Sequence, residues 1–116
     1  MVLAQPTVIH YEALPQVAIE DYLNDMQLFA LYFVDEPIMH RIGQCESGNR
    51  QFNSKGQTIV SPTNDFGRYQ INQYTWDSTA REMNLDYKGS EIDNYKMARH
   101  VLDVQGLSAW ACLKLI

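Results

Sequence analysis

The stretch Gln44-Cys45-Glu46-Ser47-Gly48 marks the end of a predicted helix and places a carboxylic acid in its last turn. Pro37 suits the first position of that helix, and Gly48 suits its end. The apolar residues between them share one face: Ile38, Met39, Ile42 and Cys45. Neighbouring apolar side chains and the negative end of the helix dipole would both raise the pKa of Glu46. A carboxylic acid that keeps its proton near neutral pH can act as a general acid, although a Glu before a helix-ending Gly is more often an ordinary surface residue.

A second informative stretch, Asn64-Asp65-Phe66-Gly67-Arg68-Tyr69-Gln70-Ile71-Asn72, precedes another predicted helix. Gly67 permits close backbone approach, Tyr69 offers a flat face for a sugar ring, and Gln70 supplies a donor and an acceptor. From residue types and spacing alone, this stretch predicts a polar site next to the start of a helix.

The sequence before these stretches predicts an irregular segment and then a helix. Residues 1–16 are expected to be irregular because Pro6 and Pro15 interrupt them, and residues 17–116 are expected to form one domain. A helix that starts near Ile19 is predicted to bury a stripe at helical spacing: Ile19, Tyr22, Leu23, Met26, Phe29, Ala30 and Phe33. Turn signals on both sides of residues 58–60 predict a small hairpin within residues 52–66.

Two more helices and a short last turn are predicted after the second stretch. One begins near Asn72, and its inward residues are Trp76, Ala80 and Met83. The other runs from Ser90, its predicted cap, to Gly106. Its inner face is Ile92, Tyr95, Ala98, Val101 and Leu102. The last turn carries Trp110 and Cys112.

Composition and charge indicate one globular domain and argue against a nucleic-acid-binding protein and a membrane-spanning protein. The chain has 116 residues, of which 46% are hydrophobic and 20% charged. Its formal net charge is −5, and residues 1–40 contain no Lys or Arg. A nucleic-acid partner is not expected, because phosphate binding needs clustered basic residues. No apolar run approaches the roughly 20 residues of a membrane-spanning helix. Residues 1–40, whose charged side chains are all Asp or Glu, are interpreted as a solvated face, with docking to a partner as the alternative.

The two cysteines limit both metal chemistry and cellular compartment. Cys45 and Cys112 alone cannot build a tetrahedral zinc site, and the sequence has no C-x-x-C pair. A disulfide between them would close a long loop and stabilise the fold by about 4 kcal/mol. It would also place the protein in an oxidising compartment. Two unconnected buried thiols are the alternative.

Three motifs in order resemble the lysozyme-like superfamily: Glu46-Ser47-Gly48, then Gly67 to Asn72 followed by Trp76, then Asn94 with Ala98. The pattern is most similar to the soluble lytic transglycosylase (SLT) domain of bacterial peptidoglycan-cleaving enzymes. In that family an E-S-G motif closes the catalytic helix and a G-x-x-Q-I motif follows a hairpin or loop. The resemblance spans roughly residues 26–112. It implies a mainly α, α+β lysozyme-like fold: a helical bundle around a catalytic helix, with one small β-hairpin or extended loop. A C-E-S start and a W-x-C end resemble a subset of the family and favour the disulfide.

The resemblance implies a role for each matching position. Glu46 would be the catalytic acid that protonates the bond between N-acetylmuramic acid and N-acetylglucosamine. Substrate contacts are expected from Ser47, Gly67, Tyr69, Gln70, Asn72 and Tyr95. Tyr95 equally suits the core, and Trp76 and Trp110 are expected to pack rather than stack on sugars. Arg68 departs from the family pattern and is expected either to point outward or to attract anionic glycan.

Asp65 bears on the type of reaction. The run Thr63-Asn64-Asp65-Phe66-Gly67 is similar to the T-D-Y-G segment of animal-type lysozymes, where the Asp is the second catalytic group. A lytic transglycosylase needs only Glu46, because the 6-hydroxyl of the sugar attacks and leaves a 1,6-anhydro product. A muramidase hydrolase would use both Glu46 and Asp65. The alternative role for Asp65 is to cap the turn before Phe66.

The sequence therefore predicts a monomeric, extracytoplasmic enzyme that cleaves the glycan strands of peptidoglycan. Lytic transglycosylase is the first interpretation and muramidase hydrolase is the second. No cofactor and no metal are expected, and neither is a nucleic-acid partner or an integral membrane segment. A catalytically inactive glycan-binding module with the same fold is the alternative from a different class.

Overall fold

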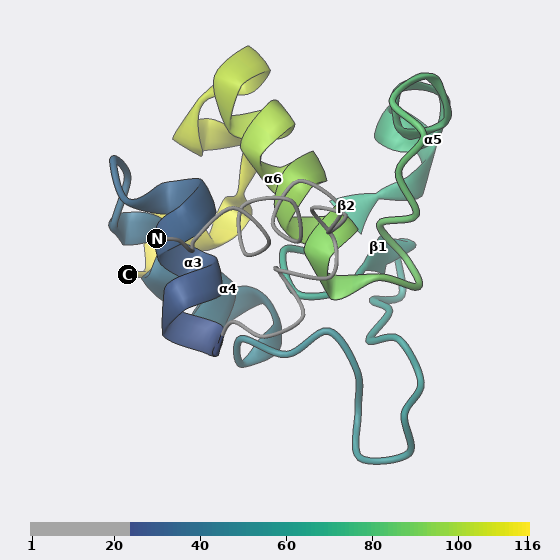
Figure 1. The fold of residues 1–116 in the computed structure, drawn as a ribbon, viewed down its shortest axis with the longest axis horizontal. Helices are drawn as coiled ribbons and strands as arrows, with labels where there is room; N and C mark the ends of the chain where they lie inside the picture. The colour runs from purple at the N-terminus through teal and green to yellow at the C-terminus, as the bar shows by residue number, and fades with distance from the viewer. Residues whose placement is uncertain (1–23) are drawn as a thin grey trace, which may run out of the picture.

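The computed structural model describes residues 24–116, which form a mainly helical structure with a small sheet (Figure 1). The α-helices are α3 (Asp25–Phe33), α4 (Ile38–Ser47), α5 (Gln73–Glu82) and α6 (Glu91–Gln105). The strands are β1 (Asp65–Phe66) and β2 (Ile71–Asn72), and two 3-10 helices follow α6: η1 (Leu107–Ala109) and η2 (Ala111–Leu115). Figure 1 shows α3 and α4 on one side, the sheet and α5 on the other, and α6 between them. A mainly helical fold with one small β element is confirmed.

Two sequence predictions lie outside the described residues, namely the irregular segment 1–16 and the start of the first helix near Ile19. Within residues 24–116, no helix is long and apolar enough to cross a membrane.

Helix α3 buries only part of the predicted stripe, at Phe29 and Phe33. Asn24 and Gln27 form a capping box at its start. Its buried residues are Leu28, Phe29 and Phe33. Met26 is 59% exposed and Ala30 is also exposed, so the predicted stripe was wrong at these two positions. The cause is composition: apolar side chains occur on every side of this short helix, and spacing alone does not select the face that meets α6.

Helix α4 forms where the sequence predicts it. Pro37 is its N-cap, one position earlier than predicted, and Gly48 ends it in the left-handed conformation at φ +70°. Met39 and Ile42 are fully buried. Cys45 lies on the surface, where it forms a disulfide with Cys112 that holds η2 against α4. The predicted bridge is therefore confirmed.

The antiparallel strands lie later in the chain than predicted. β1 pairs with β2, with Asp65 opposite Asn72 and Phe66 opposite Ile71. The predicted hairpin at residues 52–66 consists only of isolated bridges, Phe52 with Thr58 and Val60 with Phe66. The sheet forms at residues 65–72 because Gly67 and Gln70 both take positive φ angles and turn the chain back within four residues.

The last two helices follow their predicted signals. The Asn72 side chain caps α5, and the Ser90 side chain caps α6 by accepting from the N–H of Asp93. Gly106 ends α6 as predicted. The inner face of α6 is buried at Tyr95, Ala98, Val101 and Leu102, and Ile92 packs against this core. Met83 was predicted to face inward, but it is 40% exposed because it lies past the last turn of α5.

Two buried amide side chains hold the turn between β1 and β2. Asn94 accepts from the N–H of Tyr69 at 2.9 Å and donates to the carbonyls of Phe66 and Tyr87. Gln51 accepts from the N–H of Arg68 at 2.9 Å and donates to the carbonyls of Tyr87 and Lys88.

Gly67 lies so close to these amides that a Cβ there would come within 2.5 Å of both side chains. The turn that resembles the G-x-x-Q-I motif is thus fixed by hydrogen bonds to α6 and to the segment after α4, and it requires glycine.

We predict that Asn94→Ala lowers the free energy of unfolding by about 3 kcal/mol, because the buried N–H of Tyr69 loses its acceptor and the Phe66 carbonyl loses a donor, while the Tyr87 carbonyl keeps its hydrogen bond from Gln51. Urea unfolding monitored by circular dichroism measures the change. Gln105→Ala, at the exposed end of the same helix, is the matched control and should change stability by less than about 0.5 kcal/mol. Equal losses in the two variants would contradict the anchoring role of Asn94.

Candidate active site

Glu46 lies in the last turn of α4 and lines a small pocket. The pocket has a volume of about 160 Å³ and is lined by Glu46, Asp65, Gln70, Ala109, Trp110 and Ala111. Its walls come from three parts of the chain: the end of α4, the β1–β2 segment, and the two 3-10 helices with the residue between them. The structure therefore brings the two predicted catalytic carboxyl groups to one pocket together with Gln70.

The environment of Glu46 favours the protonated form of its carboxyl group. Its side chain is half-buried, and this loss of solvation raises its pKa. A backbone hydrogen bond from Cys112 acts in the opposite direction, whereas the negative charge of Asp65 adds to the rise. The net shift is upward, as the sequence predicts from apolar neighbours, and it is the shift that a general acid needs.

The environment of Asp65 favours the ionised form. Burial acts to raise its pKa, but hydrogen bonds from Thr63, Ser61 and Asn72 outweigh burial and bring the pKa below its ordinary value. The Ser61 hydroxyl donates to Oδ2 at 2.7 Å and the Asn72 amide donates to Oδ1 at 2.8 Å. Asp65 is therefore held as a carboxylate by three fixed donors on its own turn and the facing strand.

The two carboxyl groups interact while their pKa values shift in opposite directions. The charge on Asp65 helps to raise the pKa of Glu46, so Glu46 is the group of the pair that takes up a proton first as the pH falls. A pair of titratable groups whose surroundings separate their pKa values is the arrangement that assigns one as acid and the other as anion. Asp65 also takes part in the turn through its backbone and side chain, so capping and a role in the pocket coexist at this residue.

Three of the predicted substrate-binding positions make hydrogen bonds that shape the pocket. Ser47 donates from its hydroxyl to the Arg68 carbonyl at 2.7 Å and so joins the end of α4 to the β1–β2 turn. Gln70 lines the pocket, and its amide donates to the Gly67 carbonyl at 2.9 Å. Asn72 holds Asp65 and caps α5.

Tyr69 and Tyr95 lie in the core instead of the pocket. Both side chains have 0% exposure, and their rings meet edge to face at 5.5 Å between centroids. Burial raises the pKa of both phenol groups. Neither ring presents a face to a ligand in this structure, so they support the site from behind. The turn at Gly67 and Gln70 directs Tyr69 inward, an orientation that residue type alone does not predict.

Arg68 also points inward. It is 2% exposed, pairs with Glu91 at 2.9 Å and lies over the Tyr95 ring at 4.9 Å. Its charge is thus neutralised within the fold, and neither an outward position nor attraction of anionic glycan describes it. The arginine instead ties the β1–β2 turn to the first turn of α6.

Sequence reasoning missed part of the pocket wall. Ala109 and Ala111 line the pocket, and small residues carry no chemical signal that would single them out. Trp110 is 4% exposed and packs as predicted, yet it also borders the pocket. Gln51 was not predicted at all, because a polar residue after a helix end is usually solvated.

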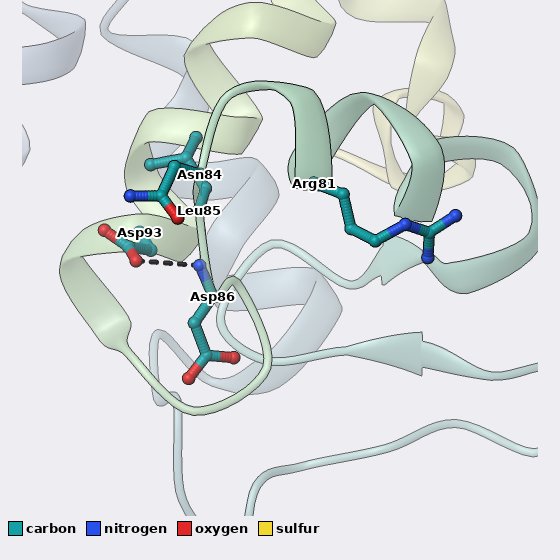
Figure 2. Close-up of a pocket in the computed structure, with 5 residues that line it drawn as sticks. All are labelled: Arg81, Asn84, Leu85, Asp86 and Asp93. Atoms are coloured by element: carbon teal, nitrogen blue, oxygen red, sulfur yellow. Dashed lines mark hydrogen bonds between the residues drawn. The ribbon is translucent and has the colours of Figure 1, made fainter.

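A larger hollow, of about 420 Å³, lies beside the connection between α5 and α6 (Figure 2). It is lined by Arg81, Asn84, Leu85, Asp86 and Asp93, none of which the sequence predicts for the site. Asp93 accepts from the N–H of Asp86 at 2.8 Å, while Figure 2 shows Arg81 directed away from both acids. These contacts stabilise the connection between the helices and bring no reactive groups together. Within residues 24–116, no three His, Cys, Asp or Glu side chains are grouped so as to hold a metal ion.

Comparison with known proteins gives no relative. No protein-family model, curated protein or solved structure matches this chain significantly. The chemistry of the pocket is therefore interpreted from its own geometry and from the three motifs.

The raised pKa of Glu46 predicts a pH-dependent stability. The folded-state pKa lies above that of the unfolded chain, so the charged side chain costs stability at high pH. This cost is absent below the unfolded pKa and complete above the folded one, so stability falls as pH rises through that window.

We therefore predict that Glu46→Gln gains stability relative to the native chain as pH rises from about 3 to about 7, measured by urea unfolding at several pH values. Glu82→Gln, at an exposed position of α5, is the control for loss of a surface carboxylate. A stability difference for Glu46→Gln that does not change with pH would contradict the raised pKa.

Proposed function

We propose that this protein cleaves the β-1,4 glycan strands of peptidoglycan, with Glu46 as the acid and then the base. The observation that carries the proposal is the pairing in one pocket of a half-buried Glu whose pKa is raised and an Asp whose pKa is lowered. A glycosidic bond breaks when its oxygen takes up a proton and the positive charge that develops on the sugar is stabilised. Glu46 supplies the proton and Asp65 supplies a nearby negative charge.

We infer a lysozyme-like domain of the lytic transglycosylase type, with α4 as the catalytic helix. A hydrogen bond between two of the motifs supports this. The Ser47 hydroxyl, in the E-S-G motif at the end of α4, donates to the carbonyl of Arg68, in the G-x-x-Q-I motif between β1 and β2. The third motif, in α6, supports it as well, because Asn94 anchors the same turn.

The proposed reaction is a transglycosylation. Glu46 protonates the oxygen between N-acetylmuramic acid and N-acetylglucosamine, and the bond from that oxygen to C1 of the muramic acid breaks. The ionised Glu46 then removes the proton from the 6-hydroxyl of the same muramic acid. The 6-oxygen bonds to C1, which closes a 1,6-anhydro ring and regenerates the protonated acid. One carboxylic acid is sufficient for both proton transfers.

Hydrolysis by a muramidase mechanism is the second candidate, and the position of Asp65 favours it. Three hydrogen-bond donors hold Asp65 as an anion in the pocket of Glu46, which is more than a turn cap requires. In this reaction water in place of the 6-hydroxyl attacks C1, or Asp65 first bonds to C1 and water, deprotonated by Glu46, then breaks that bond. The products then carry reducing ends.

The disulfide supports the proposed extracytoplasmic location, because such bonds persist in oxidising compartments. Glycan strands of peptidoglycan are then the proposed partner, and the reaction requires neither a metal nor a cofactor.

We predict that Glu46→Gln lowers the rate of cleavage of purified peptidoglycan by at least about 10²-fold, the contribution of a general acid. Mass spectrometry of the released muropeptides identifies the reaction: anhydro ends indicate transglycosylation and reducing ends indicate hydrolysis. Glu82→Gln is the control and should cleave at the native rate. Equal cleavage by Glu46→Gln and the native protein would remove Glu46 from the mechanism. Absence of cleavage by the native protein, with binding to glycan retained, would favour the inactive module.

For Asp65→Asn we predict a loss of roughly 10- to 100-fold in rate with anhydro products retained, because the variant loses a stabilising charge but keeps the acid. Asp103→Asn, at an exposed site on α6, is the control. Complete loss of activity together with reducing-end products from the native protein would favour the hydrolase.

A further inference from the structure

Both cysteines of the disulfide are close to the proposed acid. Cys45 immediately precedes Glu46 on α4, and the backbone of Cys112 forms a hydrogen bond to the Glu46 side chain. One covalent bond therefore fixes the helix that carries the acid to the segment that covers it.

The segment that ends at Cys112 forms one wall of the pocket. It contributes Ala109, Trp110 and Ala111, which lie in or between two short 3-10 helices. The indole N–H of Trp110 donates to the Tyr69 carbonyl at 2.9 Å and attaches the wall to the β1–β2 turn. η2 packs against α4, and the covalent bond between them is the disulfide. The burial that raises the pKa of Glu46 therefore depends in part on this wall segment. Trp110 attaches the segment to the β1–β2 turn, and Cys112 attaches it to α4.

We propose that the Cys45–Cys112 disulfide positions Glu46 for catalysis. The Glu46 carboxyl group keeps its half-buried position in the pocket only while the disulfide is intact. Opening the bridge frees η2 from α4, so the hydrogen bond from Cys112 is lost and water reaches the carboxyl group. The consequence for activity rests on the proposed function, whereas the consequence for the carboxyl group does not. Cys45 and Cys112 are positioning residues, because they act through Glu46 rather than on the substrate.

The disulfide lies where a reductant can reach it from the solvent. Cys45 is exposed and lines a hollow of about 370 Å³ with Arg41, Gln44 and Leu115, and His40 and Ile116 complete it. A dithiol reductant can react there: its thiolate attacks the sulfur of Cys45, the bond to Cys112 breaks, and Cys112 leaves as a thiolate that takes up a proton. The second thiol of the reductant then displaces Cys45 and forms the disulfide of the reductant. The site would thus be controlled by a dithiol that reaches it.

The decisive variant is Cys45→Ala/Cys112→Ala, which removes the bridge without adding new titrating thiols beside Glu46. Among the charged groups of the described residues, Asp65 is the one that acts on Glu46, and it is unchanged in this variant. We expect the Glu46 pKa, read from its ¹³C carboxyl resonance, to fall toward the ordinary value for glutamic acid, because the regained solvation is the larger effect and outweighs loss of the Cys112 hydrogen bond, which alone would raise the pKa. We also expect the high-pH limb of the cleavage profile to move to lower pH, with a loss of about 10- to 100-fold at neutral pH.

Two comparisons separate positioning from general loss of stability. Val101→Ala, in the buried core of α6 and outside the pocket lining, lowers stability and should leave the Glu46 pKa unchanged. Trp110→Phe keeps the bridge but loses the hydrogen bond to Tyr69, and it should give a smaller fall in the Glu46 pKa. If the double variant does not fold in buffer, the titration is carried out in trimethylamine N-oxide, which favours the compact state.

A Glu46 pKa in the double variant equal to that of the native protein would overturn the inference. So would an equal fall in Val101→Ala, because the effect would then follow from stability alone. Failure of the native protein to cleave glycan would refute the proposed function and leave the carboxyl titration as an independent test of positioning.

Discussion

The structure depends on a turn of four residues, 67–70, that is held by two buried amide side chains. Asn94 on α6 and Gln51 after α4 bond to the backbone on both sides of Gly67, where there is no room for a Cβ. Each amide is fully buried, so loss of either would leave a backbone N–H of the turn, that of Tyr69 or that of Arg68, without its partner. Because this turn joins β1 to β2, its position sets the position of every polar group on that side of the pocket.

The pocket separates the chemistry of two similar side chains. Glu46 comes from a helix end, where burial is incompletely balanced by hydrogen bonds, and its pKa rises. Asp65 comes from β1, where hydroxyl and amide donors surround it, and its pKa falls. The difference arises from the surroundings of each carboxyl group, since both face the same small space. The disulfide and Trp110 complete the burial by holding the third wall in place.

Local signals predicted the ends of the helices and the inner face of α6, and they did not predict which side chains of the β1–β2 turn face inward. Gly48 and Ser90 end or begin helices through contacts within a few residues, so the sequence is sufficient. Tyr69 and Arg68 are buried because the turn directs them toward Tyr95 and Glu91, which are distant in sequence. The strand pair was predicted too early in the chain, because the chain reverses where Gly67 and Gln70 take positive φ angles.

The account is tested most directly by measuring the carboxyl pKa values of Glu46 and Asp65 in the native protein by ¹³C NMR titration. It predicts a Glu46 value above that of glutamic acid in an unfolded peptide and an Asp65 value below that of aspartic acid in the same reference. A Glu46 carboxyl group that titrates at or below its reference value would contradict the account, because no proton would then be held in the pocket for transfer to a sugar oxygen.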